Sequence, residues 1–176
     1  MSREGTEHIL EPNIDKERER IMSELEFGKS VDEIEAPMLL GEGWKLMELT
    51  DDPKVEPNSA FKDDPNGEKA GHNWMVHLVI KDEDPATSGR RFTLWLGIPK
   101  PKDAEIYTNQ GQKVYDAKMS RIVSFVEAFG GVVKGSRVSL NKSSQGMCYV
   151  LQQISKQTGE PENVIDIFNQ GFKPAV

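Results

Sequence analysis

The sequence has few of the residues that build disulfides and metal sites. Cys148 is the only cysteine among 176 residues, so neither an internal disulfide nor a cysteine-based metal site can form. The three histidines are too few and too scattered for a histidine-rich metal site. This cysteine usage is typical of a reducing, cytoplasmic compartment.

The motifs of several large enzyme classes are also missing. There is no G-x-x-x-x-G-K-[ST] phosphate loop, no G-x-S-x-G nucleophile elbow and no H-E-x-x-H zinc motif. The acidic groups at 51–52, 63–64 and 82–84 offer carboxylates to a divalent cation, but such runs beside proline more often form turns. We therefore expect a non-enzymatic protein with no catalytic residue, no cofactor and no bound metal.

Long hydrophobic runs are absent as well. Hydrophobic residues make up 36% of the chain and charged residues 29%, with a mean hydropathy of −0.57. No stretch approaches the roughly 20 apolar residues of a membrane helix. The segment Met1–Leu10 lacks the apolar core of a signal peptide. These features predict a globular, cytoplasmic protein with no membrane partner.

Charge is distributed unevenly along the chain, whose net charge is −7. Residues 1–37 and 38–85 each carry −6, residues 86–142 carry +6, and residues 143–176 carry −1. A basic middle third inside an acidic chain is the pattern expected for an anionic partner such as nucleic acid. Chance clustering on a solvated surface would give the same numbers, so charge alone leaves both interpretations open.

Two parts of the chain differ in character. Residues 1–36 form an acidic N-terminal arm, in which Ile21, Met22 and Leu25 have helical spacing and Gly28 would end the helix. The arm is expected to dock on its own domain, to dock on a neighbour, or to fray in solution. Residues 37–176 contain the strand patterns and form the second domain.

Alternating apolar residues predict strands over 39–50, 74–80, 91–98, 136–141 and 147–154, and a short closing strand over 164–168. Residues 51–71 are expected to be a long loop. Trp74 shares a strand face with three aliphatic residues and is assigned to the core, as is Trp44. Trp95 lies opposite Phe92, Leu94 and Leu96 and is expected to face outward.

A helix is predicted over 115–129. Met119, Ile122 and Val126 form its core-facing stripe, with Phe125 and Phe129 beside them. Lys118 and Arg121 lie outside this stripe and are expected in solvent. Five main strands with one helix between the third and fourth are the element order of an OB-fold barrel. The alternative architecture is a generic α+β sandwich with the helix on one sheet face.

Three segments carry a resemblance to a known family. They are the run Gly89–Phe92, the helical segment Lys118–Gly130, and the ending Glu160–Phe168 with Gly171–Ala175. Each resembles the phage and prophage single-stranded DNA-binding-like proteins, over roughly residues 38–175. The resemblance implies an OB-fold protein of a phage replication or recombination module that coats single-stranded DNA in a bacterial cytoplasm.

One departure from the family concerns the C-terminus. Such proteins often end in an acidic tail that recruits replication or recombination proteins, whereas this sequence ends in Phe-Lys-Pro-Ala-Val. Either the acidic N-terminal arm takes that role or the recruiting function is absent. Whether the chain forms a homo-oligomer is left open.

Single-strand binding needs cations along the phosphates and aromatic faces on which bases stack. The basic segment and the strand that follows it supply both. The candidate nucleic-acid-binding residues are Arg90, Arg91, Trp95, Lys100, Lys102, Tyr107, Lys113, Tyr115, Arg137, Lys142 and Tyr149. Two further hypotheses remain: a protein-interaction module that uses the barrel and the acidic arm, and a metal-dependent nuclease that uses the acidic loops.

Overall fold

The computed structural model describes residues 28–35, 38–58 and 70–176. The chain divides into two compact units, Met1–Pro37 and Met38–Val176. The described part of the first unit contains one short 3-10 helix, η1 (Val31–Glu33), where the Ser30 amide donates a 3.1 Å hydrogen bond to the Glu33 carboxylate. The helix expected within the arm lies outside the described residues.

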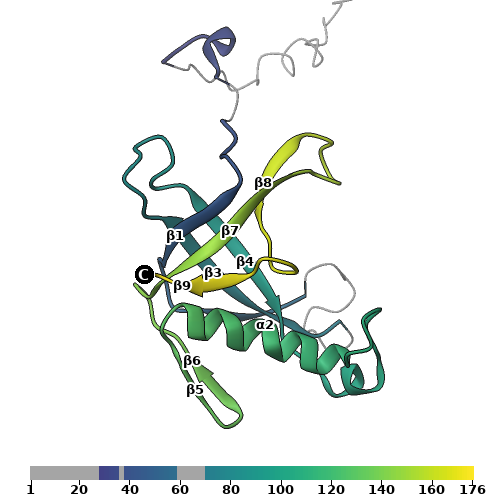
Figure 1. The fold of residues 1–176 in the computed structure, drawn as a ribbon. Coiled ribbons are helices and arrows are strands. Elements are labelled where there is room, and N and C mark those ends of the chain that lie inside the picture. The colour runs from purple at the N-terminus through teal and green to yellow at the C-terminus, as the bar shows by residue number, and fades with distance from the viewer. Residues whose placement is uncertain (1–27, 36–37, 59–69) are drawn as a thin grey trace, which may run out of the picture. The chain divides into compact units, whose positions relative to one another are not determined.

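The second unit is built on a seven-stranded antiparallel sheet (Figure 1). Its strands are β1 (Gly43–Leu49), β2 (Lys54–Pro57), β3 (His72–Ile80), β4 (Arg91–Gly97), β7 (Gln145–Ile154), β8 (Pro161–Ile165) and β9 (Phe172–Pro174). The order is β2-β3-β1-β7-β8, with β4 on the free edge of β3 and β9 beside β7. Because β1 pairs with one end of β3 and β2 with the other, these two short strands together cover one edge of β3.

One long helix and a small hairpin complete the unit. After β4 come the 3-10 helix η2 (Pro101–Glu105), the helix α2 (Val114–Ala128), and a two-stranded sheet of β5 (Val132–Lys134) and β6 (Arg137–Ser139). Gly130 has a φ of 70°, a conformation that glycine adopts readily and that often ends a helix. No helix among the described residues is long and apolar enough to cross a membrane.

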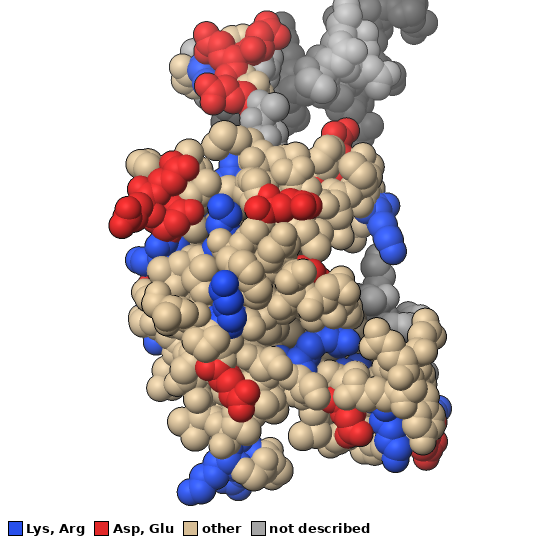
Figure 2. Space-filling view, in the orientation of Figure 1, with Lys and Arg blue, Asp and Glu red and all other residues tan. Residues whose placement is uncertain are grey.

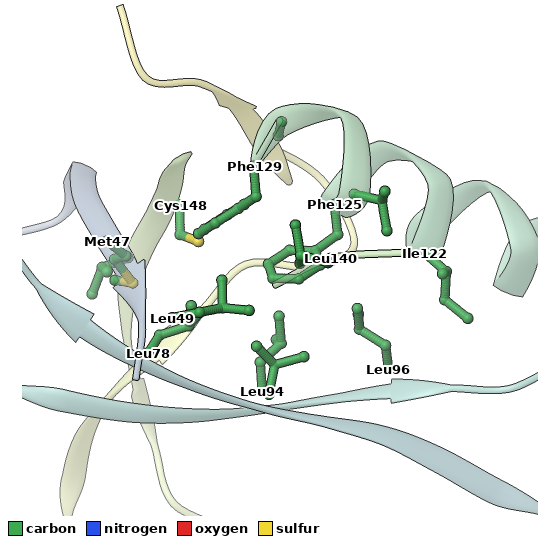
Figure 3. Close-up of a cluster of buried hydrophobic side chains, with 14 of the residues drawn as sticks. Met47, Leu49, Leu78, Leu94, Leu96, Ile122, Phe125, Phe129, Leu140 and Cys148 are labelled. Atoms are coloured by element: carbon green, nitrogen blue, oxygen red, sulfur yellow. The ribbon is translucent and has the colours of Figure 1, made fainter. Parts of the chain in front are cut away.

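The hydrophobic core lies between α2 and the inner face of the sheet. Phe125 and Phe129 point from α2 toward Leu140 and Cys148, and the leucines of β4 approach from the other side (Figure 3). Burial of this apolar surface stabilises the fold by about 25 cal/mol per Å² removed from water. The buried members are Leu40, Met47, Leu49, Val76, Leu78, Ile80, Leu94, Leu96, Ile122, Phe125, Val126, Ala128, Phe129, Leu140, Cys148 and Val150.

The expected closed barrel is not present. β4 hydrogen-bonds only to β3, and β8 only to β7, so among the described strands no ladder closes the sheet, although β4 lies close to β8. Phe125 and Phe129 of α2 are buried in the core that lies on the inner face of the sheet. The fold is therefore mainly β, with one α-helix in the described residues and an open sheet around it.

The predicted elements need several corrections. β2 falls inside the segment 51–71 that was expected to be loop, and β5 and β9 were not expected at all. These strands have three or four residues each, too few for alternation to reveal them. The segment 136–141 contributes β6 to the small separate sheet and not to the main one. The short closing strand expected over 164–168 corresponds to β8, which begins three residues earlier, at Pro161, and ends at Ile165.

Four side-chain assignments also change. Trp44 is not part of the core, because the buried residues of β1 are Met47 and Leu49, on the opposite face from Trp44. Met119 is 40% exposed and does not belong to the buried stripe of α2. Lys118 and Arg121 are each half-buried and have partners, so neither is free in solvent. Trp74 packs against the core as predicted.

Candidate nucleic-acid interface

Every second side chain of β4 points away from the core. Leu94 and Leu96 are buried, while Arg91 and Trp95 alternate with them and face outward. Trp95 is 45% exposed, which confirms the face expected for it. A tryptophan that is half in water presents a flat aromatic surface on which a planar ligand can stack.

Trp95 has a cation two strands away on the same face. In the register of the sheet, Trp95 of β4 is the partner of Met75 of β3, and Met75 is the partner of Lys54 of β2. Directly opposed side chains on one face of an antiparallel sheet lie about 4.5–5.5 Å apart at Cβ. Met75 therefore continues the apolar surface of the indole, and Lys54 ends the row with a positive charge.

A second aromatic group lies on the same face, between β1 and β7. The rings of Trp44 and Tyr149 meet edge to face with their centroids 5.5 Å apart. Lys173 of β9 lies over the indole, with its Nζ 4.3 Å from the ring centroid. An ammonium group at this distance is attracted to the aromatic face and places a positive charge directly beside it.

The two aromatic groups are joined by a row across three strands. Glu48 of β1 is the partner of Val79 in β3, and Val79 is the partner of Arg91 in β4. Trp44 lies four residues before Glu48, and Trp95 lies four residues after Arg91, so about 27 Å along the strands separates the two indoles. We call this surface the outer sheet face; its residues are Trp44, Glu48, Lys54, Met75, His77, Val79, Arg91, Thr93, Trp95, Tyr149 and Lys173.

Acidic side chains on this surface are partly compensated. The Glu48 carboxylate accepts a 2.7 Å hydrogen bond from Gln145 and lies 3.8 Å from the Lys81 ammonium. Between the two aromatic groups, His77 Nδ1 and Thr93 Oγ1 share a 3.1 Å hydrogen bond. These two residues line a hollow of about 280 Å³ together with Asp51 and Arg91. The face therefore has mixed charge, with its cations placed beside the aromatic rings.

The structure places the predicted site residues in separate groups. Arg91, Trp95 and Tyr149 lie on the outer sheet face, and Arg90 precedes β4 at its edge. A second group follows β4 around η2 and the start of α2: Lys100, Lys102, Tyr107, Lys113 and Tyr115. Arg137 lies in β6, and Lys142 lies in the turn before β7, where its backbone amide donates a 2.8 Å hydrogen bond to Asp52.

These positions do not form one continuous basic groove. Among the described residues in view, Figure 2 shows Lys and Arg scattered between Asp and Glu over the unit Met38–Val176. Tyr107 is 63% exposed and forms an isolated β-bridge with Lys113. The second group is thus a separate basic and aromatic surface at the end of the β3–β4 hairpin.

A buried ion pair anchors this second group to the helix. Asp103 of η2 is 3% exposed, and its carboxylate lies 2.9 Å from the Lys118 ammonium of α2. Burial opposes ionisation of Asp103, but hydrogen bonds from the Lys100 amide and from Lys118 outweigh it and hold the pKa below its usual range. The carboxylate therefore stays charged and ties η2 to the first turns of α2.

Sequence reasoning included only Arg91, Trp95 and Tyr149 of the outer sheet face. Among the members that it missed, Trp44, Lys54 and Lys173 supply an aromatic ring or a cation. Trp44 was assigned to the core because Leu46 continues its alternation, but both residues face outward and Met47 and Leu49 face inward. Lys54 and Lys173 lie in short strands that the pattern did not reveal. The segment Trp44–Leu49 carries apolar residues on both faces, so alternation alone could not decide which face is buried.

No cation-binding cluster emerges from the geometry. The described residues contain no group of three or more His, Cys, Asp or Glu side chains that could hold a metal ion. Cys148 is fully buried, and this burial raises the pKa of its thiol, so it is poorly suited to act as a nucleophile or metal ligand. Comparisons with family models, curated proteins and solved structures gave no match.

Proposed function

We propose that this protein binds single-stranded DNA, without catalysis and with little sequence preference, through the outer sheet face. The observation that carries the proposal is the pair of outward-facing indoles, each accompanied by a cation. Trp95 is followed by Lys54 across the sheet, and Trp44 lies under the Lys173 ammonium. Stacking platforms beside cations are what non-specific single-strand binding requires.

The strand order supports an OB-type assignment within this proposal. The path β4-β3-β1-β7-β8 places the β3–β4 hairpin on one side of β1 and the β7–β8 hairpin on the other, and α2 follows β4 in sequence. An OB-fold is a five-stranded, partly open barrel that binds oligonucleotides on the face of its second and third strands. In this chain β3 and β4 have those positions, and they carry Met75, Arg91 and Trp95.

Aromatic rings and charged side chains contribute to single-strand binding in different ways. Stacking of one base on an aromatic side chain contributes about 1–3 kcal/mol and works for any base. Each Lys or Arg that neutralises a phosphate releases counterions and makes binding salt-dependent. A protein of net charge −7 has no general attraction for DNA, so local cations beside the rings must provide the phosphate contacts. We further propose a role in phage replication or recombination, which rests on the family resemblance.

The test is a titration of the full chain with oligo-dT and, separately, with a duplex of equal length. Tryptophan fluorescence is the readout of both titrations. Trp74 packs against the core, so quenching by oligo-dT would report mainly on Trp44 and Trp95. We expect preferential binding of the single strand and a log–log salt slope of about −0.7 per phosphate contact. Equal binding to both, or no binding at about 50 mM salt, would contradict the proposal and favour a protein partner.

A further inference from the structure

A second hollow lies apart from the outer sheet face, and no residue of that face lines it. It is a cleft of about 540 Å³ between α2, the loop 108–112 and the loop 167–171, which we call the α2 cleft. This volume is within the range of about 300–1,000 Å³ typical of small-molecule sites. The proposed function makes no use of the α2 cleft.

One wall of the cleft is a loop organised by a buried carboxylate. Asp166 is 7% exposed, and its oxygens accept hydrogen bonds from the backbone amides of Phe168, Asn169 and Gln170 at 3.1–3.3 Å. Burial opposes ionisation of Asp166, but these amides outweigh it and keep its pKa below the usual range. The carboxylate thus holds the loop in a defined conformation before any ligand arrives.

This loop presents an aromatic ring to solvent. Phe168 is 73% exposed, unusual for a side chain with no polar atom. Arg121 of α2 lies beside the ring, with its Cζ 4.7 Å from the ring centroid, so ring and guanidinium are arranged together in the cleft. A planar ligand can stack on the phenyl ring or on the guanidinium plane, and the guanidinium can also bind an anion.

The remaining lining is rich in neutral hydrogen-bonding groups. Side-chain amides come from both loops, and serine hydroxyls come from α2; the amides are those of Asn109, Gln110, Gln112, Asn169 and Gln170. Arg121 is the only charged residue among those that line the cleft in the described part of the chain. Amides can donate to and accept from the edges of an unstacked base, and one cation matches one phosphate.

We propose that the α2 cleft binds a single nucleotide, with its base stacked at Phe168 and Arg121 and its edge hydrogen-bonded by the surrounding amides. This inference rests on the proposed function for the source of the nucleotide, which is a base flipped out of a bound single strand. The cleft chemistry favours a nucleotide over a peptide because a flat ring, several amides and one cation match base, edge and phosphate together.

The backbone of Tyr149 connects the cleft to the outer sheet face. The Asp166 amide donates a 2.9 Å hydrogen bond to the Tyr149 carbonyl, and the Tyr149 amide donates to the Gly171 carbonyl at 3.4 Å. Both ends of the cleft loop are therefore held by the residue whose ring contacts Trp44. A strand on the outer sheet face that reaches Trp44 is thus close to the loop that carries Phe168.

The experiment is a nitrogen-15 NMR titration of the full chain with oligo-dT, with thymidine monophosphate, and with a glutamate-rich peptide. Indole Nε1 signals report on the outer sheet face, and the side-chain amide signals of Asn109, Gln110, Asn169 and Gln170 report on the cleft. We expect oligo-dT to shift both sets. If thymidine monophosphate shifts the cleft amides in addition to oligo-dT, the cleft also binds a free nucleotide, which further supports the proposal.

Matched variants complete the test. Phe168→Ala is expected to weaken oligo-dT binding at least about fivefold and to abolish the cleft shifts while the indole shifts remain. Arg121→Gln should weaken binding as well, whereas Lys156→Gln, which removes one exposed charge after β7, should preserve the cleft shifts. Melting temperatures would confirm that each variant is folded.

Failure of the cleft proposal can be distinguished from failure of the proposed function. If oligo-dT shifts the indoles but leaves the cleft amides unchanged, the cleft proposal is overturned and the proposed function stands. If oligo-dT shifts neither set, both proposals are overturned. Shifts of the cleft amides by the glutamate-rich peptide alone would identify a peptide site and would also overturn the nucleotide assignment.

Discussion

Trp44, Trp74 and Trp95 show how differently one residue type is used on a single sheet. Trp74 meets Phe125 of α2 edge to face, with centroids 6.4 Å apart, and belongs to the packed interior. Trp95 and Trp44 lie on the opposite face, one 45% exposed and the other beside Tyr149 and Lys173. Only the latter two indoles can offer a stacking surface to a ligand.

Substitutions on β4 should separate stacking from charge. Trp95→Ala is expected to lower single-strand affinity by about 1–3 kcal/mol with an unchanged salt slope, because no phosphate contact is lost. Arg91→Ala should make the slope shallower by about 0.7. Fluorescence anisotropy of a labelled oligonucleotide over a range of salt concentrations measures both quantities.

The control for this comparison is the stability of each variant. Both side chains are exposed, so each substitution should change the free energy of unfolding by only about 0.5 kcal/mol. A large loss of stability in Trp95→Ala, with unchanged affinity of the folded fraction, would show that the indole supports the fold and does not contact DNA.

At the scale of elements, the packing of α2 against β7 decides the shape of the core. Gly146 of β7 lies beneath the C-terminal end of the helix, where a Cβ atom would lie 2.5 Å from the Phe129 ring and 2.9 Å from the Ala128 carbonyl oxygen. A glycine is therefore needed for the close approach of helix and strand. This contact helps to fix the position of α2 over the open sheet.

Gly146→Ala should accordingly destabilise the protein by about 1–3 kcal/mol, since the added methyl group overpacks a filled interior. Urea denaturation followed by circular dichroism measures the change as a lower midpoint at constant slope. Gly41→Ala is the matched control, because a Cβ atom there has nothing within 4 Å. Equal stability of the two variants would contradict the packing of Phe129 on β7.

At the scale of the whole molecule, charge is divided between the two units. Residues 1–37 carry −6 of the net charge of −7, so the unit Met38–Val176 has a net charge of only −1. Within this second unit, Lys54 and Lys173 lie on the same sheet face as the outward-facing aromatic rings. An acidic segment in the same chain lowers the local concentration of any polyanion by electrostatic repulsion. The acidic arm is therefore expected to weaken DNA binding when salt is low.

Deletion of residues 1–36 should tighten single-strand binding at about 10 mM salt, where the Debye length is about 30 Å, and have little effect at about 1 M, where it is about 3 Å. The remaining chain has a net charge of −1. Anisotropy titrations of both proteins at the two salt concentrations test this directly. Loss of folding in the shortened chain would instead make the arm part of the core, and unchanged affinity at low salt would exclude the competition.

Local pattern alone was sufficient for the long elements. Residues 74–80 alternate strictly, and the strand β3 follows them with two more residues at its start. The stripe of Met119, Ile122 and Val126, with Phe125 and Phe129 beside it, predicted α2 within one residue at each end, although Met119 is exposed. These signals are strong because each element buries one continuous apolar face, so every second or every third to fourth residue must be apolar.

The composition of the candidate site was harder to predict than the long elements, because it depends on contacts between residues far apart in the sequence. The alternation of β4 predicted that Trp95 faces outward, but the pairing of Trp44 with Tyr149 joins residues 105 positions apart in sequence. The same holds for Lys118 and Arg121, whose spacing indicated solvent but whose partners, Asp103 and Phe168, come from other segments. Helical spacing reports which face a side chain is on, not what another segment places there.

The sequence by itself thus determined the predominance of strands, the long helix α2, the outward position of Trp95 and the uneven distribution of charge, because each follows from residues close together in the chain. Tertiary structure alone decided that the sheet stays open, that Trp44 faces outward and that the α2 cleft exists. Those features depend on strand register and on which segments meet. Register is set by packing between distant segments, and a shift of one residue would exchange the two faces of a strand.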